Sequence, residues 1–213
     1  MRAVIFDMDG LMIDSEKVYF EAGRIIAREF GKEVSDQTLG RMMGRKPLES
    51  VALFARELKI DEAPENLLKR REAKVMGVLE QGVDKMPGLD FILETLAPTR
   101  PLAIATSAPK YIVDVVMRKL DVRRYFKVIQ TSDDVVNGKP DPEIYLKAMG
   151  KLEVAPSESI VLEDSSNGAL AGKRAGAYVI AVPSVYTRGQ DFSFVDYVAL
   201  DLTDAGRHVE SLG

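Results

Sequence analysis

The sequence has no cysteine, and it has a single histidine, His208, among 213 residues. The absence of cysteine excludes disulfides, thiolate nucleophiles and cysteine-ligated metal sites, and it fits a reducing compartment. A histidine base would have to be His208, which lies near the end of the sequence, where we expect a solvated tail residue. Catalysis or metal binding is therefore expected to depend on carboxylates, hydroxyls and lysines.

An excess of basic residues and a long apolar run are also missing. The 29 lysines and arginines stand against 33 aspartates and glutamates, a net charge of -4, so there is no overall basic surface for nucleic acid or an anionic membrane. No secretion signal is visible, because Asp7 and Asp9 interrupt the apolar start. We expect a cytoplasmic protein that binds neither nucleic acid nor membrane, and nothing demands more than a monomer.

The first ten residues carry the strongest local signal. Apolar residues 4–6 lead into Asp7, Asp9 and Gly10, the pattern of a buried parallel strand that ends in a turn. Side chains two residues apart in an extended segment point the same way, so Asp7 and Asp9 should leave the strand together. Two such carboxylates imply a bound cation, a shared proton, or both. The alternative is a solvated turn after the strand.

The rest of the chain changes character near residue 86. Residues 15–85 have only helical periodicity and predict a helical bundle. Beyond them, strands predicted at 102–105, 127–129, 159–162 and 178–182, with a weak one near 197–200, alternate with helices. We therefore predict an α/β fold: a Rossmann-like doubly wound parallel sheet formed by residues 1–14 and 86–213, with residues 15–85 as an inserted helical cap. One of its helices should begin with Asp141 as N-cap and Pro142 as first residue.

Chemically active side chains stand at the predicted strand ends. Thr106 and Ser107 follow one strand, Lys139 lies in a loop, and Glu163 and Asp164 end another strand. Ligands of such sheets bind beyond the carboxyl ends of the strands, so these residues are expected to meet there. Carboxylates without histidine or cysteine suit a hard cation such as Mg²⁺, and hydroxyls before a helix suit phosphate. Taken singly, they are also explained as a helix cap, a surface lysine and a solvated strand end.

The order of four motifs resembles the haloacid dehalogenase-like hydrolase superfamily, in its phosphatase and phosphomutase branch with a helical cap. The motifs are Asp7-Met-Asp-Gly-Leu-Met-Ile-Asp14-Ser-Glu, Ala105-Thr-Ser, Gly138-Lys-Pro-Asp-Pro and Glu163-Asp-Ser-Ser-Asn-Gly168. Together they span most of the chain. Four motifs in this order are far more specific than the first one alone.

The resemblance implies a role for each catalytic residue. Asp7 would be the nucleophile that forms an aspartyl-phosphate, and Asp9 the general acid and then the base. Thr106 and the amide of Ser107 would hold phosphate oxygens, and Lys139 would offset negative charge on the phosphate and the nucleophile.

The resemblance also implies a magnesium site. Asp7, the backbone carbonyl of Asp9 and the side chain of Asp164 would hold Mg²⁺. Glu163 would either coordinate the ion or orient the groups that do.

Substrate choice in this branch belongs largely to the cap. The segment Met43-Gly-Arg-Lys-Pro-Leu-Glu49 is similar to that of pseudouridine-5'-phosphatase-type enzymes, with Arg45 and Lys46 as candidate substrate contacts. Phosphomutases of the β-phosphoglucomutase type usually carry arginine where Pro47 stands and histidine where Tyr19 stands. We therefore expect a phosphatase for a small sugar or nucleotide-type phosphomonoester, with a sugar phosphomutase as the alternative.

A phospho-receiver signalling domain combines similar residues without turning over a substrate. Such domains lack a helical insertion after the first strand and carry their phosphorylated aspartate on a later strand. The order of elements here disfavours that interpretation.

Overall fold

The computed structural model describes residues 1–42 and 47–213, which form two compact units. One unit, here called the sheet unit, consists of Met1–Asp14 and Asp84–Gly213. The other, the inserted unit, is Ser15–Val83. In sequence, the inserted unit therefore interrupts the sheet unit shortly after its first strand.

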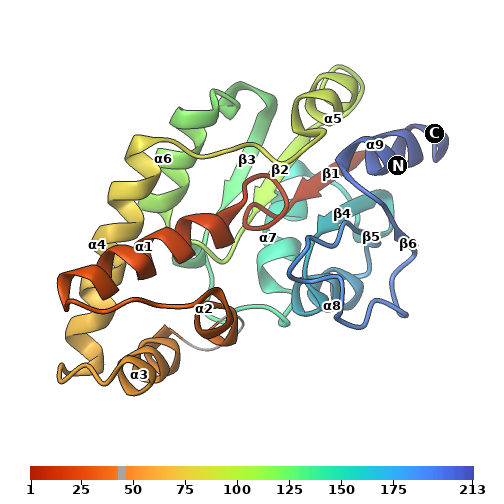
Figure 1. The fold of residues 1–213 in the computed structure, drawn as a ribbon. Coiled ribbons are helices and arrows are strands. Elements are labelled where there is room, and N and C mark those ends of the chain that lie inside the picture. The colour runs from red at the N-terminus through yellow and green to blue at the C-terminus, as the bar shows by residue number, and fades with distance from the viewer. Residues whose placement is uncertain (43–46) are drawn as a thin grey trace. The chain divides into compact units, whose positions relative to one another are not determined.

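The sheet unit is built on six parallel strands in the order β3-β2-β1-β4-β5-β6 (Figure 1). Their bounds are β1 (Ala3–Phe6), β2 (Leu102–Ala105), β3 (Phe126–Gln130), β4 (Ser159–Glu163), β5 (Tyr178–Ala181) and β6 (Tyr197–Val198). Strand β1 lies at the centre, where Ile5 pairs with Ala103 of β2 and with Val161 of β4. The strand order reverses between β1 and β4, the place where ligands bind in doubly wound sheets.

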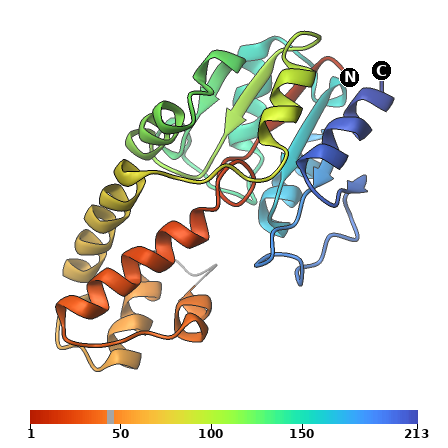
Figure 2. The ribbon, with the colours of Figure 1, turned by 45° about the horizontal axis from the view of Figure 1, so that its top comes forward.

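Helices cover both faces of this sheet. They are α5 (Leu89–Leu96), α6 (Lys110–Leu120), α7 (Glu143–Leu152), α8 (Ser166–Ala175) and α9 (Leu202–Ser211), with short 3-10 turns η1 (Arg123–Tyr125), η2 (Ser132–Asp134) and η3 (Pro156–Glu158). Figure 2 shows α5 and α9 on one face, while α7 and α8 pack on the other. This arrangement follows from right-handed crossovers that run in opposite directions from the central strands. The predicted doubly wound α/β class is confirmed.

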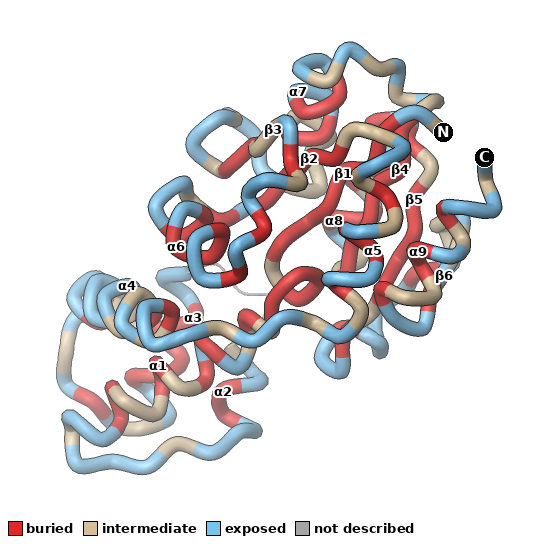
Figure 3. The backbone as a smooth tube through the Cα atoms, turned by 90° about the horizontal axis from the view of Figure 1, so that it is seen from above, coloured by how far each residue is buried: buried red, intermediate tan, exposed pale blue. Residues whose placement is uncertain are grey.

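The strands are apolar because both of their faces are covered. Every residue of β1, β2 and β4 is buried, as the red strands of Figure 3 show. On the face of α7 and α8, the core consists of Ile5, Ala103, Ala105, Ile144, Tyr145, Ala148, Met149, Val161, Ala169, Ala171, Ala175, Ala177, Val179, Ala181 and Phe192. The many alanines of α8 let that helix approach the sheet closely.

Among its described residues, the inserted unit has helices joined by loops and contains no strand. It contains α1 (Ser15–Glu29), α2 (Asp36–Met42), α3 (Pro47–Leu58) and α4 (Pro64–Gln81), and α4 packs against both α1 and α3. Its own apolar core consists of Phe20, Ile26, Ala27, Leu39, Val51, Phe54, Ala55, Ile60 and Leu67. No helix among the described residues is long and apolar enough to cross a membrane.

Helix α7 begins one residue later than predicted. Pro142 is its capping residue and Glu143 its first helical residue. Asp141 still has a capping function, because its Oδ1 atom accepts the backbone N–H of Glu143 at 3.0 Å. Asp141 therefore caps the helix from the position just before the N-cap residue Pro142.

The expectation that His208 is a solvated tail residue is wrong. It belongs to α9, where its ring stacks on that of Tyr197 with centroids 3.8 Å apart, and its Nε2 lies 3.0 Å from the hydroxyl of Tyr178. Helix α9 packs against α5 and buries Leu202 and Val209. The two tyrosines belong to β5 and β6, which are distant from His208 in sequence. The sequence around His208 therefore could not show that its ring would be packed and hydrogen-bonded.

Two glycines of neighbouring helices give a matched test of the packing. A Cβ at Gly172 of α8 would lie 2.9 Å from Val179 Cγ2 and 3.1 Å from Val161 Cγ1, whereas one at Gly150 of α7 would have no neighbour within 4 Å. We expect Gly172→Ala to lower the free energy of unfolding by about 1–3 kcal/mol. Gly150→Ala should raise it by about 0.5–1 kcal/mol, because alanine favours the helix. Urea unfolding measures both, and equal effects would contradict the close approach of α8.

Candidate active site

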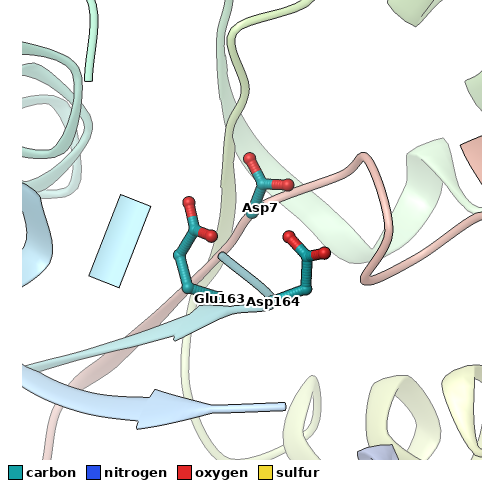
Figure 4. Close-up of side chains that lie close together, drawn as sticks. All are labelled: Asp7, Glu163 and Asp164. Atoms are coloured by element: carbon teal, nitrogen blue, oxygen red, sulfur yellow. The ribbon is translucent and has the colours of Figure 1, made fainter. Parts of the chain in front are cut away.

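Three buried carboxylates meet where β1 and β4 end. Asp7 follows the last residue of β1, Glu163 is the last residue of β4, and Asp164 comes next. The two strand ends are in register, because the N–H of Asp7 donates to the carbonyl of Leu162 at 2.9 Å. One oxygen from each carboxylate lies within 4.8 Å of the others, and Figure 4 shows the three groups gathered at this point.

The ammonium group of Lys139 lies between two of these carboxylates. Its Nζ atom donates to Asp7 Oδ1 at 2.6 Å, to Glu163 Oε1 at 2.7 Å and to the backbone carbonyl of Ala105 at 3.0 Å. An ammonium has three N–H donors, so all of them are used. Its side chain is only 8% exposed, which makes this a buried ion pair and not a surface contact.

Burial sets the electrostatics of the cluster. It raises the pKa of Asp7 to about 8, with Lys139 acting in the opposite direction and Glu163 adding to the rise. Burial alone would lower the pKa of Lys139, but Asp7 and Glu163 raise it well above its usual range, so this ammonium stays charged. With a pKa of about 8, Asp7 holds a proton at neutral pH; when all three carboxyl groups are ionised, the single ammonium leaves two negative charges in excess.

A divalent metal ion fits this donor set. Oxygen ligands from carboxylates are those that hard cations prefer, and two positive charges would balance the excess. The acidic cluster of Asp7, Glu163 and Asp164 can therefore hold a divalent metal ion.

Two glycines make room for the carboxylates. Gly10 has a φ of 75°, in the left-handed region, and a Cβ there would overlap the carboxylate of Asp164. At Gly168, in the first turn of α8, a Cβ would overlap the carboxylate of Glu163. Any larger residue at either position would displace a carboxylate of the cluster.

Asp9 lies outside the group of three carboxylates and faces the end of β2. Its carboxylate is half-buried, and its Oδ2 accepts a hydrogen bond from the hydroxyl of Thr106 at 3.3 Å. Thr106 is fully buried directly after β2. The structure therefore connects the ends of β1 and β2 through these two side chains, as it connects β1 and β4 through Lys139.

Ser107 is exposed in the loop between β2 and α6. Helix α6 begins only at Lys110, whose backbone N–H already donates to Asp133 Oδ2 at 3.0 Å. The N–H of Ala108 also has a partner, Thr106 Oγ1 at 3.1 Å, and Pro109 has no N–H. An anion at this loop would therefore meet the N–H of Ser107 and not the first N–H of the helix.

The two predicted substrate contacts, Arg45 and Lys46, lie outside the described residues. Tyr19, which stands where the mutases usually carry histidine, lies on α1 with a partly exposed ring. The guanidinium carbon of Arg71, from α4 of the same unit, is 5.8 Å from the centre of that ring. Arg71 also donates to the hydroxyl of Ser50 at 2.9 Å.

Sequence analysis missed two residues that contact Glu163. The hydroxyl of Tyr145 donates to Glu163 Oε1 at 2.8 Å, and the backbone N–H and hydroxyl of Ser165 donate to Oε2 at 3.1 and 2.9 Å. Burial, followed by the charge of Glu163, raises the pKa of Tyr145 well above its usual range, so its hydroxyl keeps the proton it donates. The sequence held one indication of this contact: Tyr145 is the polar residue on an otherwise apolar face of the predicted helix, and a buried phenol needs a hydrogen-bond partner.

A family model for haloacid dehalogenase-like hydrolases matches residues 4–182. The chain belongs to this family. It is 40% identical over 177 residues to a Thermotoga maritima protein named phosphorylated carbohydrates phosphatase, covering 83% of this chain and 82% of the relative. It is 31% identical over 209 residues to a Drosophila melanogaster protein provisionally named pseudouridine-5'-phosphatase, covering 94% and 89%.

A solved structure extends the similarity to the whole fold. The crystal structure of a provisionally named beta-phosphoglucomutase from Thermotoga maritima matches with a TM-score of 0.88 and 33% identity, over 100% of both chains. The resemblance to this superfamily is therefore confirmed, and its phosphatase-named and mutase-named members both appear among the relatives.

Metal binding can be tested without any substrate. A divalent ion at about 100 times its Kd should add about 2.7 kcal/mol to the free energy of unfolding, and so raise the Tm. Asp164→Asn should lose most of this gain because it removes a ligand charge. Asp114→Asn is the matched control, since Asp114 is exposed on α6 and pairs with Lys110. Equal metal-induced shifts of Tm in both variants would rule out Asp164 as a ligand.

Proposed function

We propose that the chain is a Mg²⁺-dependent phosphatase that hydrolyses a small phosphomonoester through an aspartyl-phosphate on Asp7. The observation that carries this proposal is the contact of Asp7 with Lys139 at the end of the central strand, beside Glu163 and Asp164. A carboxylate held by a fixed ammonium, next to a second carboxylate two residues on, suits transfer of a phosphoryl group to and from the protein.

In the first step, a carboxylate oxygen of Asp7 attacks phosphorus and the bond to the ester oxygen breaks. Asp9 gives its proton to that leaving oxygen, which departs as an alcohol. In the second step, Asp9 takes a proton from water, and the water oxygen attacks phosphorus. The acyl-phosphate bond breaks, inorganic phosphate leaves, and the Asp7 carboxylate is restored.

Other groups of the site support these steps. Lys139 offsets negative charge where it develops, and it is already in place before the substrate arrives. The hydroxyl of Thr106 donates to the carboxylate of Asp9 before the substrate binds. On binding, this single donor would turn to a phosphate oxygen, and the amide of Ser107 would bind another. Asp7, the carbonyl of Asp9 and Asp164 would hold Mg²⁺, which would supply positive charge next to the phosphate.

The names of the relatives support the substrate class. One relative is named phosphorylated carbohydrates phosphatase and another, provisionally, pseudouridine-5'-phosphatase. Both names agree with a small sugar or nucleotide-type phosphate as the substrate. We propose that the inserted unit acts as the cap that selects it, with Arg45 and Lys46 as contacts. We also propose a cytoplasmic monomer.

A sugar phosphomutase is the second candidate, favoured by the provisional name of the Thermotoga maritima structure. A mutase must hold a second phosphate and keep water away from the aspartyl-phosphate. The sequence departs from that type at Tyr19 and Pro47, and Tyr19 presents a phenol beside Arg71 instead of an imidazole. Hydrolysis is therefore preferred.

Replacing the two aspartates tests the mechanism. Asp7→Asn removes the nucleophile and should reduce turnover of p-nitrophenyl phosphate by at least about a thousandfold, to the background of the assay. Asp9→Asn cannot donate or accept the proton and should slow turnover by about 10²–10⁴-fold. Asp114→Asn again serves as the control with unchanged turnover. Substantial activity in Asp7→Asn would remove Asp7 as nucleophile.

Product analysis separates hydrolysis from isomerisation. Incubation with a panel of sugar and nucleotide monophosphates should release inorganic phosphate in step with substrate loss. Accumulation of an isomeric sugar phosphate without free phosphate would instead favour the mutase. Phosphorus NMR follows both products in one sample.

A further inference from the structure

Tyr145 is the one tyrosine of α7, and it is fully buried in the core between that helix and the sheet. Its neighbours on the helix face, such as Ile144, Ala148 and Met149, are apolar. A buried phenol is costly unless its hydroxyl has a partner. The partner here is Glu163 Oε1, at 2.8 Å, so the hydroxyl is directed at the acidic cluster.

The hydrogen bonds to Glu163 fill its capacity as an acceptor. Lys139 and Tyr145 donate to Oε1, and the N–H and hydroxyl of Ser165 donate to Oε2. A carboxylate has about four acceptor positions, so this one is fully occupied. Glu163 is therefore held in one orientation by donors on both oxygens, and Tyr145 supplies one of the two on the side of Lys139.

Tyr145 contacts Lys139 as well as Glu163. The Nζ atom lies 4.8 Å from the centre of the phenol ring, within the range of a cation–π interaction. The same side chain thus contacts both members of the Lys139–Glu163 pair, with its hydroxyl on one and its ring on the other. Lys139 in turn donates to Asp7 at 2.6 Å, which extends the chain of contacts to the proposed nucleophile.

We propose that Tyr145 is a positioning residue for phosphoryl transfer: its hydroxyl fixes Glu163, and Glu163 with the phenol ring fixes the Lys139 ammonium against Asp7. This inference rests on the proposed function of the site and adds a residue to it. Because donors within the protein occupy both oxygens of Glu163, this carboxylate would add negative charge to the acidic cluster and orient Lys139, while Asp7 and Asp164 would be the carboxylates that contact a metal ion.

The test is Tyr145→Phe, which keeps the ring and removes only the hydroxyl. We expect kcat for p-nitrophenyl phosphate to fall by about tenfold, because removing a residue that hydrogen-bonds to a catalytic or ligating side chain typically has an effect of this size. KM should change less than about twofold. Calorimetric titration with Mg²⁺ alone should give a Kd within about twofold of the wild type, since this route leaves Asp7 and Asp164 in place.

Tyr178→Phe is the matched control. Tyr178 begins β5 in the same sheet and loses an equivalent hydrogen bond, to His208, away from the acidic cluster. Its kcat should stay at the wild-type value. Equal kcat values for the two variants and the wild type would overturn the proposal. So would a loss of Mg²⁺ affinity in Tyr145→Phe as large as the loss in kcat, because Glu163 would then act on the metal.

A double-mutant cycle gives a second and independent measurement. In a Glu163→Gln background, Tyr145→Phe should reduce kcat by less than about twofold, because the hydroxyl acts through the carboxylate. A full tenfold reduction in that background would show that Tyr145 acts by another route. If the wild-type protein hydrolyses no phosphomonoester, the proposed function is wrong. If the wild type is active and Tyr145→Phe has the same kcat, only the role of Tyr145 is wrong.

Discussion

One buried ammonium connects the ends of three neighbouring strands. Lys139 donates to the carbonyl that ends β2, to Asp7 just beyond β1 and to Glu163 at the end of β4. Removing it would leave two buried carboxylates without their partner, a change that typically costs about 3–5 kcal/mol. The arrangement of the acidic cluster therefore depends on a residue that reaches it from a loop before α7, far away in sequence.

The cluster is also crowded, which restricts where its charges can lie. Gly10 and Gly168 leave room for the carboxylates of Asp164 and Glu163, and no side chain larger than hydrogen fits at either position without displacing them. Donors on both oxygens of Glu163 fix its orientation. Preorganisation of this kind lets fixed charges act on a reacting phosphate without first having to move.

Much of this architecture could be predicted from the sequence. Short apolar runs marked β1, β2, β4 and β5, whereas β3 and β6 gave weaker signals. The polar residues that follow the strands marked the site, because parallel strands bring their ends to one edge of the sheet. The partners that helix side chains find on the sheet were not predictable. His208 stacks on Tyr197, and Tyr145 reaches Glu163, only after the helices pack on the sheet. Periodicity identifies a buried helix face, but it does not tell which partner a polar atom on that face will find.

The insertion after β1 also affects how the chain is made. The central strand is synthesised before its neighbours in the sheet, which begin only at Leu102 and Ser159. Meanwhile the inserted unit, which has an apolar core of its own, emerges complete. During synthesis both hydrogen-bonding edges of β1 therefore stay unpaired until β2 and β4 have been made. Pairing of strands that are so far apart in sequence is slow. Until those neighbours are made, the four apolar residues of β1 have no sheet to pair with, and an exposed apolar strand of this kind favours aggregation.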